Sequence, residues 1–160
     1  MTAAANFLEN DNHNACIGCG PTNPIGLKLQ FRRESDHVVS HFTPDARHQG
    51  WPERLHSGIL YLAMLETANW TIYGLHGRPG CPTKTSPLEL LGRVPIGATI
   101  TLAGRLDPHA TSNNVRVEAR LDHNLIATLQ REFDFPTRTE FAKRMGYQTI
   151  PQSVHEFFHE

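Results

Sequence analysis

One stretch of the sequence, Gly58 to Leu75, constrains the fold more than any other, because it is long, apolar and carries Glu66 as its only charge. Its large apolar residues fall on all sides of a helix, and a helix of that kind has to be covered by other elements. The length invites a membrane-spanning interpretation, but Asn69, several threonines and the central Glu66 favour a buried core helix. Ser57 is the expected N-cap. The expected stop signals are Gly74, Gly77, Pro79 and Gly80.

Alternating apolar and polar residues predict strands on both sides of this helix. The run from Leu27 to Phe31 predicts a half-buried strand, and a second strand at His37 to Phe42 is expected to pair with it. Residues 44–55 predict a surface loop. Four strands are expected after the helix, at Leu88 to Val94, Thr99 to Leu106, Val115 to Leu121 and Leu125 to Phe135. Short connections at 107–113 and 122–124 predict that the last three form an antiparallel meander.

This order of elements predicts an α+β fold, in which an antiparallel sheet of about five to six strands wraps around one long central helix. The chain of 160 residues suits one domain. We expect an N-terminal segment over 1–15, the domain over 16–136 and a C-terminal helical tail over 137–160. Three residues of the tail are candidate docking points, namely Phe141, Phe157 and Phe158.

The composition and the N-terminus argue against a nucleic-acid-binding protein and against a secreted, disulfide-bonded protein. The 15 basic and 16 acidic residues nearly balance, and there is no basic run, so the chain lacks the footprint of a nucleic-acid-binding protein. The N-terminus lacks the basic-then-apolar layout of a signal peptide, and three cysteines are too few for a disulfide framework. We therefore expect a reduced, cytoplasmic protein with neither a nucleic-acid nor a membrane partner.

Cys16 and Cys19 form a Cys-x-x-Cys pair that allows three interpretations. A zinc site normally has four ligands, and the sequence adds only His13 and the distant Cys81. A redox pair is the second interpretation. A structural role in the N-terminal turn is the third and the favoured one, so no metal is expected.

Three local motifs carry a resemblance to a known family. The first is Cys16-Ile-Gly-Cys-Gly-Pro-Thr-Asn-Pro-Ile-Gly-Leu27, which runs into the first predicted strand. The second is Phe42-Thr-Pro-Asp-Ala-Arg-His-Gln-Gly50 followed by Leu55-His56-Ser57-Gly58-Ile59, and the third is Val94-Pro95-Ile96-Gly97. In this order and spacing they make about residues 16–135 resemble the hotdog-fold thioesterases, in particular the PaaI-like branch.

The resemblance implies a homodimer, often a dimer of dimers, with acyl-thioester sites at the subunit interface and acyl-CoA as the substrate. In such enzymes a carboxylate on the central helix acts as base or nucleophile, and a backbone N–H at the helix N-terminus polarises the carbonyl. The resemblance makes His56 the signature histidine and places Gln49 in the loop that faces the partner's helix. It also places Thr83, on the strand after the helix, toward the site.

The residues themselves favour the same chemistry. A helix N-terminus offers free N–H groups and a favourable dipole to a developing negative charge, and Gly58 lets a ligand approach the backbone closely. Glu66 is the only carboxylate on the helix, and burial raises the pKa of a carboxyl group, which makes it a better base near neutral pH. The predicted catalytic residues are Glu66, Gln49, His56 and Gly58.

Further candidates bind substrate, and each has a structural alternative. The substrate-binding candidates are His48, Ser57, Asn69 and Thr83, while Arg78, Lys84 and Arg93 are candidates for the phosphates of coenzyme A. Structural alternatives are a solvated loop for His48 and Gln49, a cap for His56 and a hydrogen-bonded buried acid for Glu66. No cofactor is expected, because a thiolate is already a good leaving group.

One departure from the family keeps a second function open. The usual acid lies nine positions after the signature histidine, where this chain has Leu65, and Glu66 follows one residue later. We predict acyl-thioester hydrolysis, with water positioned by Gln49 of the neighbouring subunit and deprotonated by Glu66. The alternative is a non-catalytic hotdog protein that binds an acyl thioester or another apolar ligand. A hydratase or dehydratase is disfavoured, because those enzymes resemble a different helix signature with an Asp and His pair.

Overall fold

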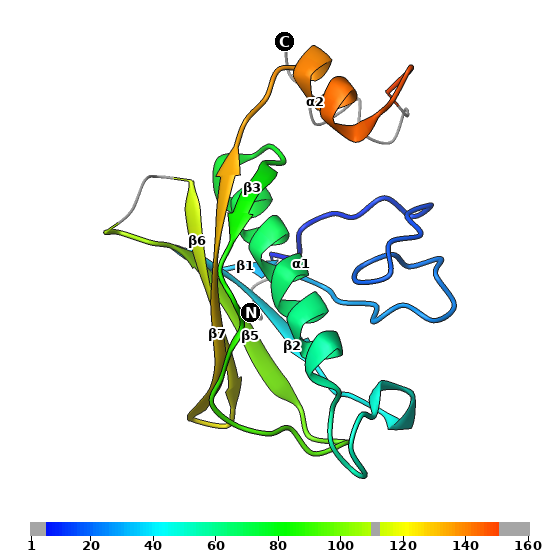
Figure 1. Cartoon of the computed structure of the whole chain (residues 1–160), viewed down its shortest axis with the longest axis vertical. Coiled ribbons are helices and arrows are strands. Elements are labelled where there is room, and N and C mark those ends of the chain that lie inside the picture. The colour runs from blue at the N-terminus through cyan, green and yellow to red at the C-terminus, as the bar shows by residue number, and fades with distance from the viewer. Residues whose placement is uncertain (1–5, 110–112, 151–160) are drawn as a thin grey trace, which may run out of the picture.

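The computed structural model describes residues 6–109 and 113–150, which form one sheet and three helices (Figure 1). The strands are β1 (Arg32–Arg33), β2 (His37–Phe42), β3 (Cys81–Thr85), β4 (Glu89–Leu90), β5 (Ile100–Leu106), β6 (Asn114–Leu121) and β7 (Asn124–Asp134). The helices are the 3-10 helix η1 (Ala46–His48), the long α1 (Ser57–His76) and α2 (Arg138–Met145). Within these ranges, none of the helices has the length and apolar character needed to cross a membrane.

All strands of the sheet pair antiparallel, in the order β1-β2-β5-β6-β7-β3, and β4 also pairs with β7. The predicted meander is confirmed, since β5, β6 and β7 are consecutive neighbours. The described sheet has 7 strands, where the sequence predicted five to six. The α+β fold, with one long helix against an antiparallel sheet, is as predicted (Figure 1).

α1 lies directly on the sheet, where it packs against β2, β5 and β6. Its buried residues are Leu60, Ala63, Met64, Thr67, Ala68, Thr71, Ile72 and Gly74. α1 approaches β5 closely at Gly104, where a Cβ atom would lie 2.0 Å from Thr71 Oγ1. The Thr71 hydroxyl donates a hydrogen bond to Thr67 O at 2.6 Å, so this buried polar group is satisfied. A glycine at position 104 is therefore what allows α1 to contact β5.

The N-terminal segment covers another side of α1 (Figure 1). Phe31 stacks on Trp70 with the ring centroids 5.1 Å apart. The segment is tied to the sheet edge, where the Leu8 N–H donates to Phe31 O at 2.8 Å. Seven apolar residues of α1 nonetheless stay half-buried, among them Tyr61, Leu62 and Leu65. The covering of α1 within one chain is therefore incomplete.

The first predicted strand is mostly wrong. Residues 27–31 show the expected alternation, with Leu29 and Phe31 buried, but they form no strand. The backbone at Lys28 has a φ of 57°, which interrupts an extended strand. The N–H groups of Leu27 and Leu29 donate instead to the carbonyls of Ile17 and Gly18, at 2.8 and 3.1 Å. The hydrogen-bonding partner of this segment is thus the Cys-x-x-Cys loop, and only β1 joins the sheet.

Two other boundaries differ from the prediction. The N-cap of α1 is His56, one residue before the expected Ser57, because the His56 ring accepts the hydrogen bond of the Gly58 N–H. Only Glu89–Leu90 of the predicted strand at 88–94 pairs in the sheet. β3 precedes it and carries Thr83.

The C-terminal tail begins with a helix, as predicted. Thr137 caps α2 and forms a capping box with Glu140, and Arg144 pairs with Asp134 of β7 at 2.6 Å. Phe141 contacts Tyr147, with ring centroids 6.3 Å apart, rather than the core. The other two predicted docking points, Phe157 and Phe158, lie outside the described residues.

We expect Gly104→Ala to lower the free energy of unfolding by about 1–3 kcal/mol, because the new methyl group overlaps Thr71. Urea denaturation followed by circular dichroism measures this loss. Thr71→Ala removes the overlapping hydroxyl, so the same glycine substitution should cost less in that background. Equal costs in both backgrounds would contradict the close contact between these two residues.

Candidate functional site

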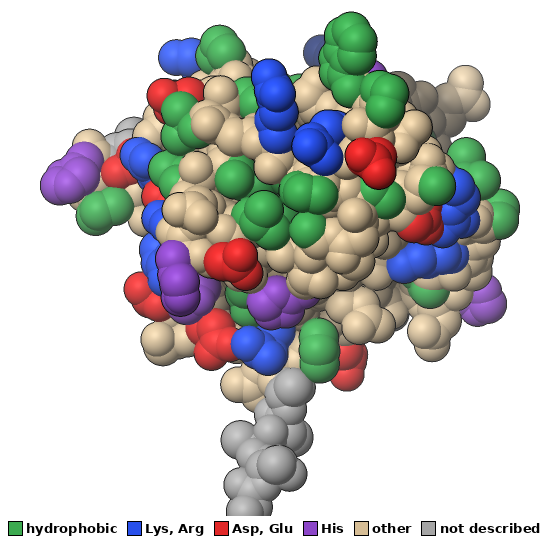
Figure 2. Space-filling view, turned by 90° about the horizontal axis from the view of Figure 1, so that it is seen from below, with side chains coloured by type: hydrophobic (Ala, Val, Ile, Leu, Met, Phe, Trp, Pro, Cys, Tyr) green, Lys and Arg blue, Asp and Glu red, His purple; other side chains and the backbone are tan. Residues whose placement is uncertain are grey.

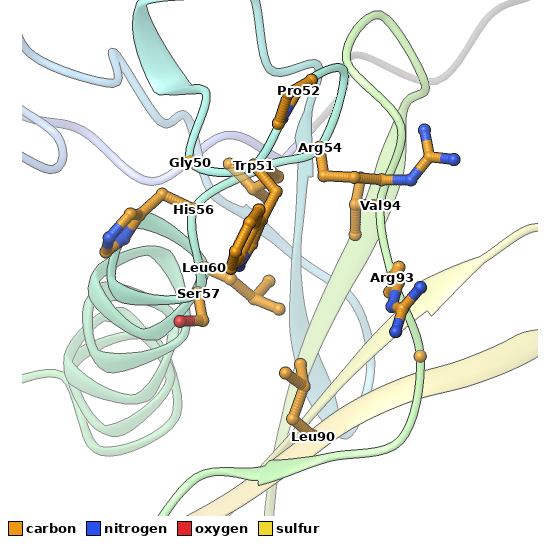
Figure 3. A pocket seen from close by; sticks show the side chains of 12 residues that line it. Gly50, Trp51, Pro52, Arg54, His56, Ser57, Leu60, Leu90, Arg93 and Val94 are labelled. Carbon is orange, nitrogen blue, oxygen red and sulfur yellow. The ribbon is translucent and has the colours of Figure 1, made fainter.

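A cavity of about 960 Å³ opens at the N-terminal end of α1, between the loop before the helix and the segment after β4. Its lining residues are Gly50, Trp51, Pro52, Arg54, Leu55, His56, Ser57, Leu60, Leu90, Gly92, Arg93 and Val94. Figure 2 views the molecule from the end at which α1 begins and shows hydrophobic side chains gathered there, with Lys and Arg side chains beside them. Figure 3 shows the Trp51 ring between the start of the helix and the segment from Leu90 to Val94.

The loop before α1 is held in place by its own polar groups. Gln49 Oε1 accepts a hydrogen bond from the Glu53 N–H at 2.9 Å, and the Gly50 N–H donates to Arg54 O at 2.9 Å. The Leu55 N–H donates to Val94 O at 2.9 Å, which joins the two walls of the cavity. Gln49 is exposed and does not line the cavity, so its amide is committed to the loop rather than to the cavity.

His48 is a buried part of the same loop rather than an open binding residue. Its Nδ1 accepts a hydrogen bond from the Asp45 N–H at 3.0 Å and completes the capping box of η1. The ring also packs edge-on against Phe42, with centroids 5.2 Å apart. In one chain, His48 therefore supports the loop.

The start of α1 presents two different kinds of donor. The Gly58 N–H, predicted to polarise a carbonyl, donates to His56 Nδ1 at 2.9 Å. Because Nδ1 accepts this hydrogen bond, a neutral His56 carries its proton on Nε2 and offers an N–H there. The Ser57 N–H has no hydrogen-bond partner among the described residues. The available donors at the helix start are therefore Ser57 N and His56 Nε2.

Two arginines bring positive charge to the cavity. Arg54 and Arg93 are exposed, and their guanidinium groups lie on the side away from α1 (Figure 3). Neither takes part in a salt bridge within residues 6–109 and 113–150. The other predicted phosphate ligands lie outside the cavity: Arg78 stacks over Phe135 at 4.2 Å, and Lys84 pairs with Glu132 at 3.9 Å. Of the two arginines that line the cavity, Arg93 was a candidate from the sequence and Arg54 was not.

Glu66 lies in a separate cluster with the two cysteines of the N-terminal loop. Its Oε2 is 3.6 Å from Cys16 Sγ, and its Oε1 accepts a hydrogen bond from Asn69 Nδ2 at 3.4 Å. The ligand atoms of Cys16, Cys19 and Glu66 all lie within 4.8 Å of one another. Glu66 and Asn69 are absent from the lining of the cavity. The predicted base and the helix start are therefore separate within one chain.

The three groups of this cluster shift one another's ionisation. The hydrogen bond from the Cys19 thiol lowers the pKa of Cys16 to about 5. The same hydrogen bond, together with burial, raises the pKa of Cys19. Burial, followed by the charge of Cys16, raises the pKa of the Glu66 carboxyl. The ionisation of the three groups is therefore coupled, and a change in the charge of one changes the pKa values of the others.

The remaining predicted residue, Thr83, is exposed on β3, which is the last strand at one edge of the sheet. The structure thus brings His56, Ser57 and Arg93 together at the cavity and Glu66 and Asn69 together at the cysteine cluster. Trp51 is missed by the sequence analysis, and it is 84% exposed at the cavity. The only signal for it was an aromatic residue in a loop, which carries little information by itself.

No family model and no curated protein matches the sequence. Solved structures do match the fold. A thioesterase superfamily protein matches with a TM-score of 0.65 and 20% identity over 77% of this chain, which spans 61% of that protein. A phenylacetic acid degradation-related protein of Ralstonia eutropha, named as a thioesterase, matches with a TM-score of 0.57 and 17% identity over 67% of this chain and 84% of its own.

A third match is a hypothetical thioesterase protein of Streptococcus pneumoniae solved with coenzyme A, with a TM-score of 0.55 and 13% identity over 66% of this chain and 86% of its own. At sequence identities of 13–20%, the similarity to these structures shows a shared fold and nothing more. The expectation from the three sequence motifs is confirmed at that level: the chain has the hotdog fold of the thioesterase superfamily proteins.

Proposed function

We propose that this protein hydrolyses acyl thioesters of coenzyme A in the cavity at the start of α1. The observation that carries the proposal is one cavity with hydrogen-bond donors at the helix end and two arginines without ion-pair partners. Leu60, Leu90 and Val94 give it an apolar wall for an acyl chain. Arginine binds phosphate oxygens through paired N–H groups. The neighbour solved with coenzyme A shares the fold and supports the same class of ligand.

In this proposal, the thioester carbonyl oxygen accepts hydrogen bonds from the Ser57 N–H and the His56 Nε2–H. Both donors are fixed before substrate binds, because the Gly58 N–H holds the His56 ring through Nδ1. Fixed donors stabilise the negative charge that develops on the oxygen when water attacks the carbonyl carbon. Gly58 thus acts on the substrate through His56.

The attacking water needs a proton acceptor, and we assign this role to Glu66 of a second copy. Glu66 is the only carboxylate of α1 and does not line the cavity of its own chain. A second copy would cover the half-buried face of α1 at Tyr61, Leu62 and Leu65 and complete the burial of that helix. The Gln49 side-chain oxygen is bonded to the Glu53 N–H, so Gln49 would position the water through its Nε2 group, and Thr83 on the edge strand β3 would lie at the same interface.

A non-catalytic acyl-thioester protein is the second candidate, and one observation favours it. No carboxylate lines the cavity among the residues that the structure describes. Leu65 occupies the position of the acid in the related family, and Glu66 interacts with Cys16 and Asn69. Such a protein would bind acyl-CoA without releasing the thiol.

Thiol release from short-chain, medium-chain, long-chain and aromatic acyl-CoA separates the two candidates. We expect turnover by the wild type and a decrease of about 10²- to 10⁴-fold in Glu66→Gln, because the amide cannot accept a proton. Glu89→Gln, an exposed carboxylate on β4, is the matched control and should keep full activity. Binding of acyl-CoA by the wild type without thiol release would assign the binding function instead.

The two arginines should affect only substrates that carry phosphates. We expect Arg54→Ala and Arg93→Ala each to raise KM for acyl-CoA about tenfold, since a hydrogen bond to a charged group contributes about 1.5 kcal/mol. KM for the same acyl group on N-acetylcysteamine, which has no phosphate, should not change. Arg78→Ala lies outside the cavity and serves as the control. An equal rise with both substrates would place these arginines at the acyl end.

His56 has a capping role and a proposed catalytic role that two substitutions separate. His56→Ala removes the cap of α1 and should lower the free energy of unfolding by about 0.5–2 kcal/mol. His56→Asn supplies another capping side chain, so stability should recover while kcat stays low, because the Nε2–H is lost. Thermal denaturation and kcat are measured on both variants. Full activity in His56→Asn would remove the ring from the mechanism.

A further inference from the structure

The cysteine cluster has the form of a built site rather than a chance contact. Cys16 and Cys19 lie on a tight loop in which the Gly20 N–H donates to Cys16 O at 2.9 Å. The loop rests on α1 at Gly18, where a Cβ atom would lie 2.2 Å from Glu66 Cγ and 3.2 Å from Glu66 Oε2. A glycine at position 18 therefore allows the loop and the Glu66 carboxylate to meet.

Both sulfur atoms receive hydrogen bonds from neighbouring groups. The Gly18 N–H donates to Cys16 Sγ at 3.3 Å, and Asn14 Nδ2 donates to Cys19 Sγ at 3.6 Å. Asn14 Oδ1 in turn accepts from the Cys16 N–H at 2.8 Å, which fixes the start of the loop. N–H donors of this kind stabilise thiolates and orient them, as they do around metal-bound cysteines.

The acidic groups of the cluster have no direct ion pair within the described residues, and the Arg131 guanidinium acts on Glu66 only through its charge, without a salt bridge. No Lys, Arg or His side chain forms a salt bridge with Glu66 within the part of the chain that the structure describes. Cys19 is 7% exposed, so water does little to stabilise a charge there. Partly buried anionic ligands need either protons or a cation as their counter-charge. Asn69 Oδ1, next to Glu66 on the helix, is also buried without a hydrogen-bond partner.

We propose that Cys16, Cys19 and Glu66 bind Zn²⁺, with Glu66 supplying the third ligand that a Cys-x-x-Cys pair by itself lacks. Two thiolates select a thiophilic cation and exclude Mg²⁺ and Ca²⁺, which take oxygen ligands. A tetrahedral Zn²⁺ needs neighbouring ligand atoms roughly 3.5 to 3.8 Å apart, given bonds of about 2.3 Å to sulfur and about 2.1 Å to oxygen.

The observed separations fit this geometry closely enough for side-chain rotation to complete it. Cys16 Sγ and Glu66 Oε2 are 3.6 Å apart, and all three ligand atoms lie within 4.8 Å of one another. Three protein ligands leave the fourth position of a tetrahedral ion to water. The sequence alone pointed away from zinc because it showed no second pair of ligands, only His13 and the distant Cys81. The third ligand lies 50 residues away from Cys16.

The site shares Glu66 with the proposed function, although none of its three ligands lines the cavity of its own chain. A coordinated carboxylate does not accept a proton, so thiol release is compared in metal-free chains, in which Glu66 is available as the base. Metal content is measured without substrate, so the zinc proposal can be confirmed or overturned whatever the result of the thiol-release assay.

The test is the zinc content of the full chain, purified under reducing conditions without chelator and measured by inductively coupled plasma mass spectrometry. We expect about one Zn²⁺ per chain in the wild type and loss of the metal in Cys16→Ser and Cys19→Ser. Cys81→Ser is the matched control: this cysteine is buried on β3, apart from the cluster, and the variant should keep its metal. Replacement by Co²⁺ should produce a thiolate charge-transfer band that follows the same pattern.

Two further variants test the third ligand. Glu66→Gln should weaken Zn²⁺ binding, and Gly18→Ala, which leaves all three ligands in place but displaces Glu66, should raise the Kd about 10- to 100-fold. Competition with a chromophoric chelator measures both. A wild type that neither contains nor takes up Zn²⁺ would overturn the proposal, as would unchanged affinity in Glu66→Gln. A Cys16–Cys19 disulfide that forms once the reductant is removed, in place of zinc binding, would assign a redox pair instead. Mass spectrometry detects it as the loss of two hydrogens.

Discussion

The need to cover α1 on every side is the constraint on which the rest of the structure depends. Burying one large aliphatic side chain is worth about 1.5–3 kcal/mol, and α1 carries such residues around its whole circumference. The sheet covers one side, which requires Gly104 at the contact with Thr71. The N-terminal segment covers another through the stack of Phe31 on Trp70. Cys19, Leu29 and Phe31 of this segment are therefore part of the hydrophobic core.

The strands that the sequence predicted well are those in which burial and pairing agree. His37–Phe42 was predicted to the residue, and this strand pairs with β5 along its whole length and buries four of its six residues. Residues 27–31 alternate strictly and form no strand, because their N–H groups donate to the Cys-x-x-Cys loop. Alternation indicates which side chains are buried. Alternation does not show which segment the backbone N–H and C=O groups bond to.

The same distinction applies to the start of α1. Serine is a much commoner N-cap than histidine, and this preference predicted Ser57. His56 takes the position because its ring nitrogen lies 2.9 Å from the Gly58 N–H, a contact that depends on the loop held by Val94. His56, Ser57 and Arg93 were all candidates from the sequence, and the structure places these three at one cavity. Trp51 and Arg54 also line the cavity, because of the path that the loop before α1 takes. Residue spacing in the sequence does not predict that path.

The position of the one acid on α1 explains why the structure has two polar centres. A step of one residue turns a side chain by about 100° around the helix axis. Leu65 stays on the half-buried face, while Glu66 meets Gly18 and Cys16 of the N-terminal loop. A carboxylate at position 65 would have no cysteine nearby, and a side chain at position 18 would exclude the carboxylate at 66. The glycine, the cysteine pair and the displaced acid therefore depend on one another, and in the proposed mechanism a second copy supplies the proton acceptor for the cavity at the helix start.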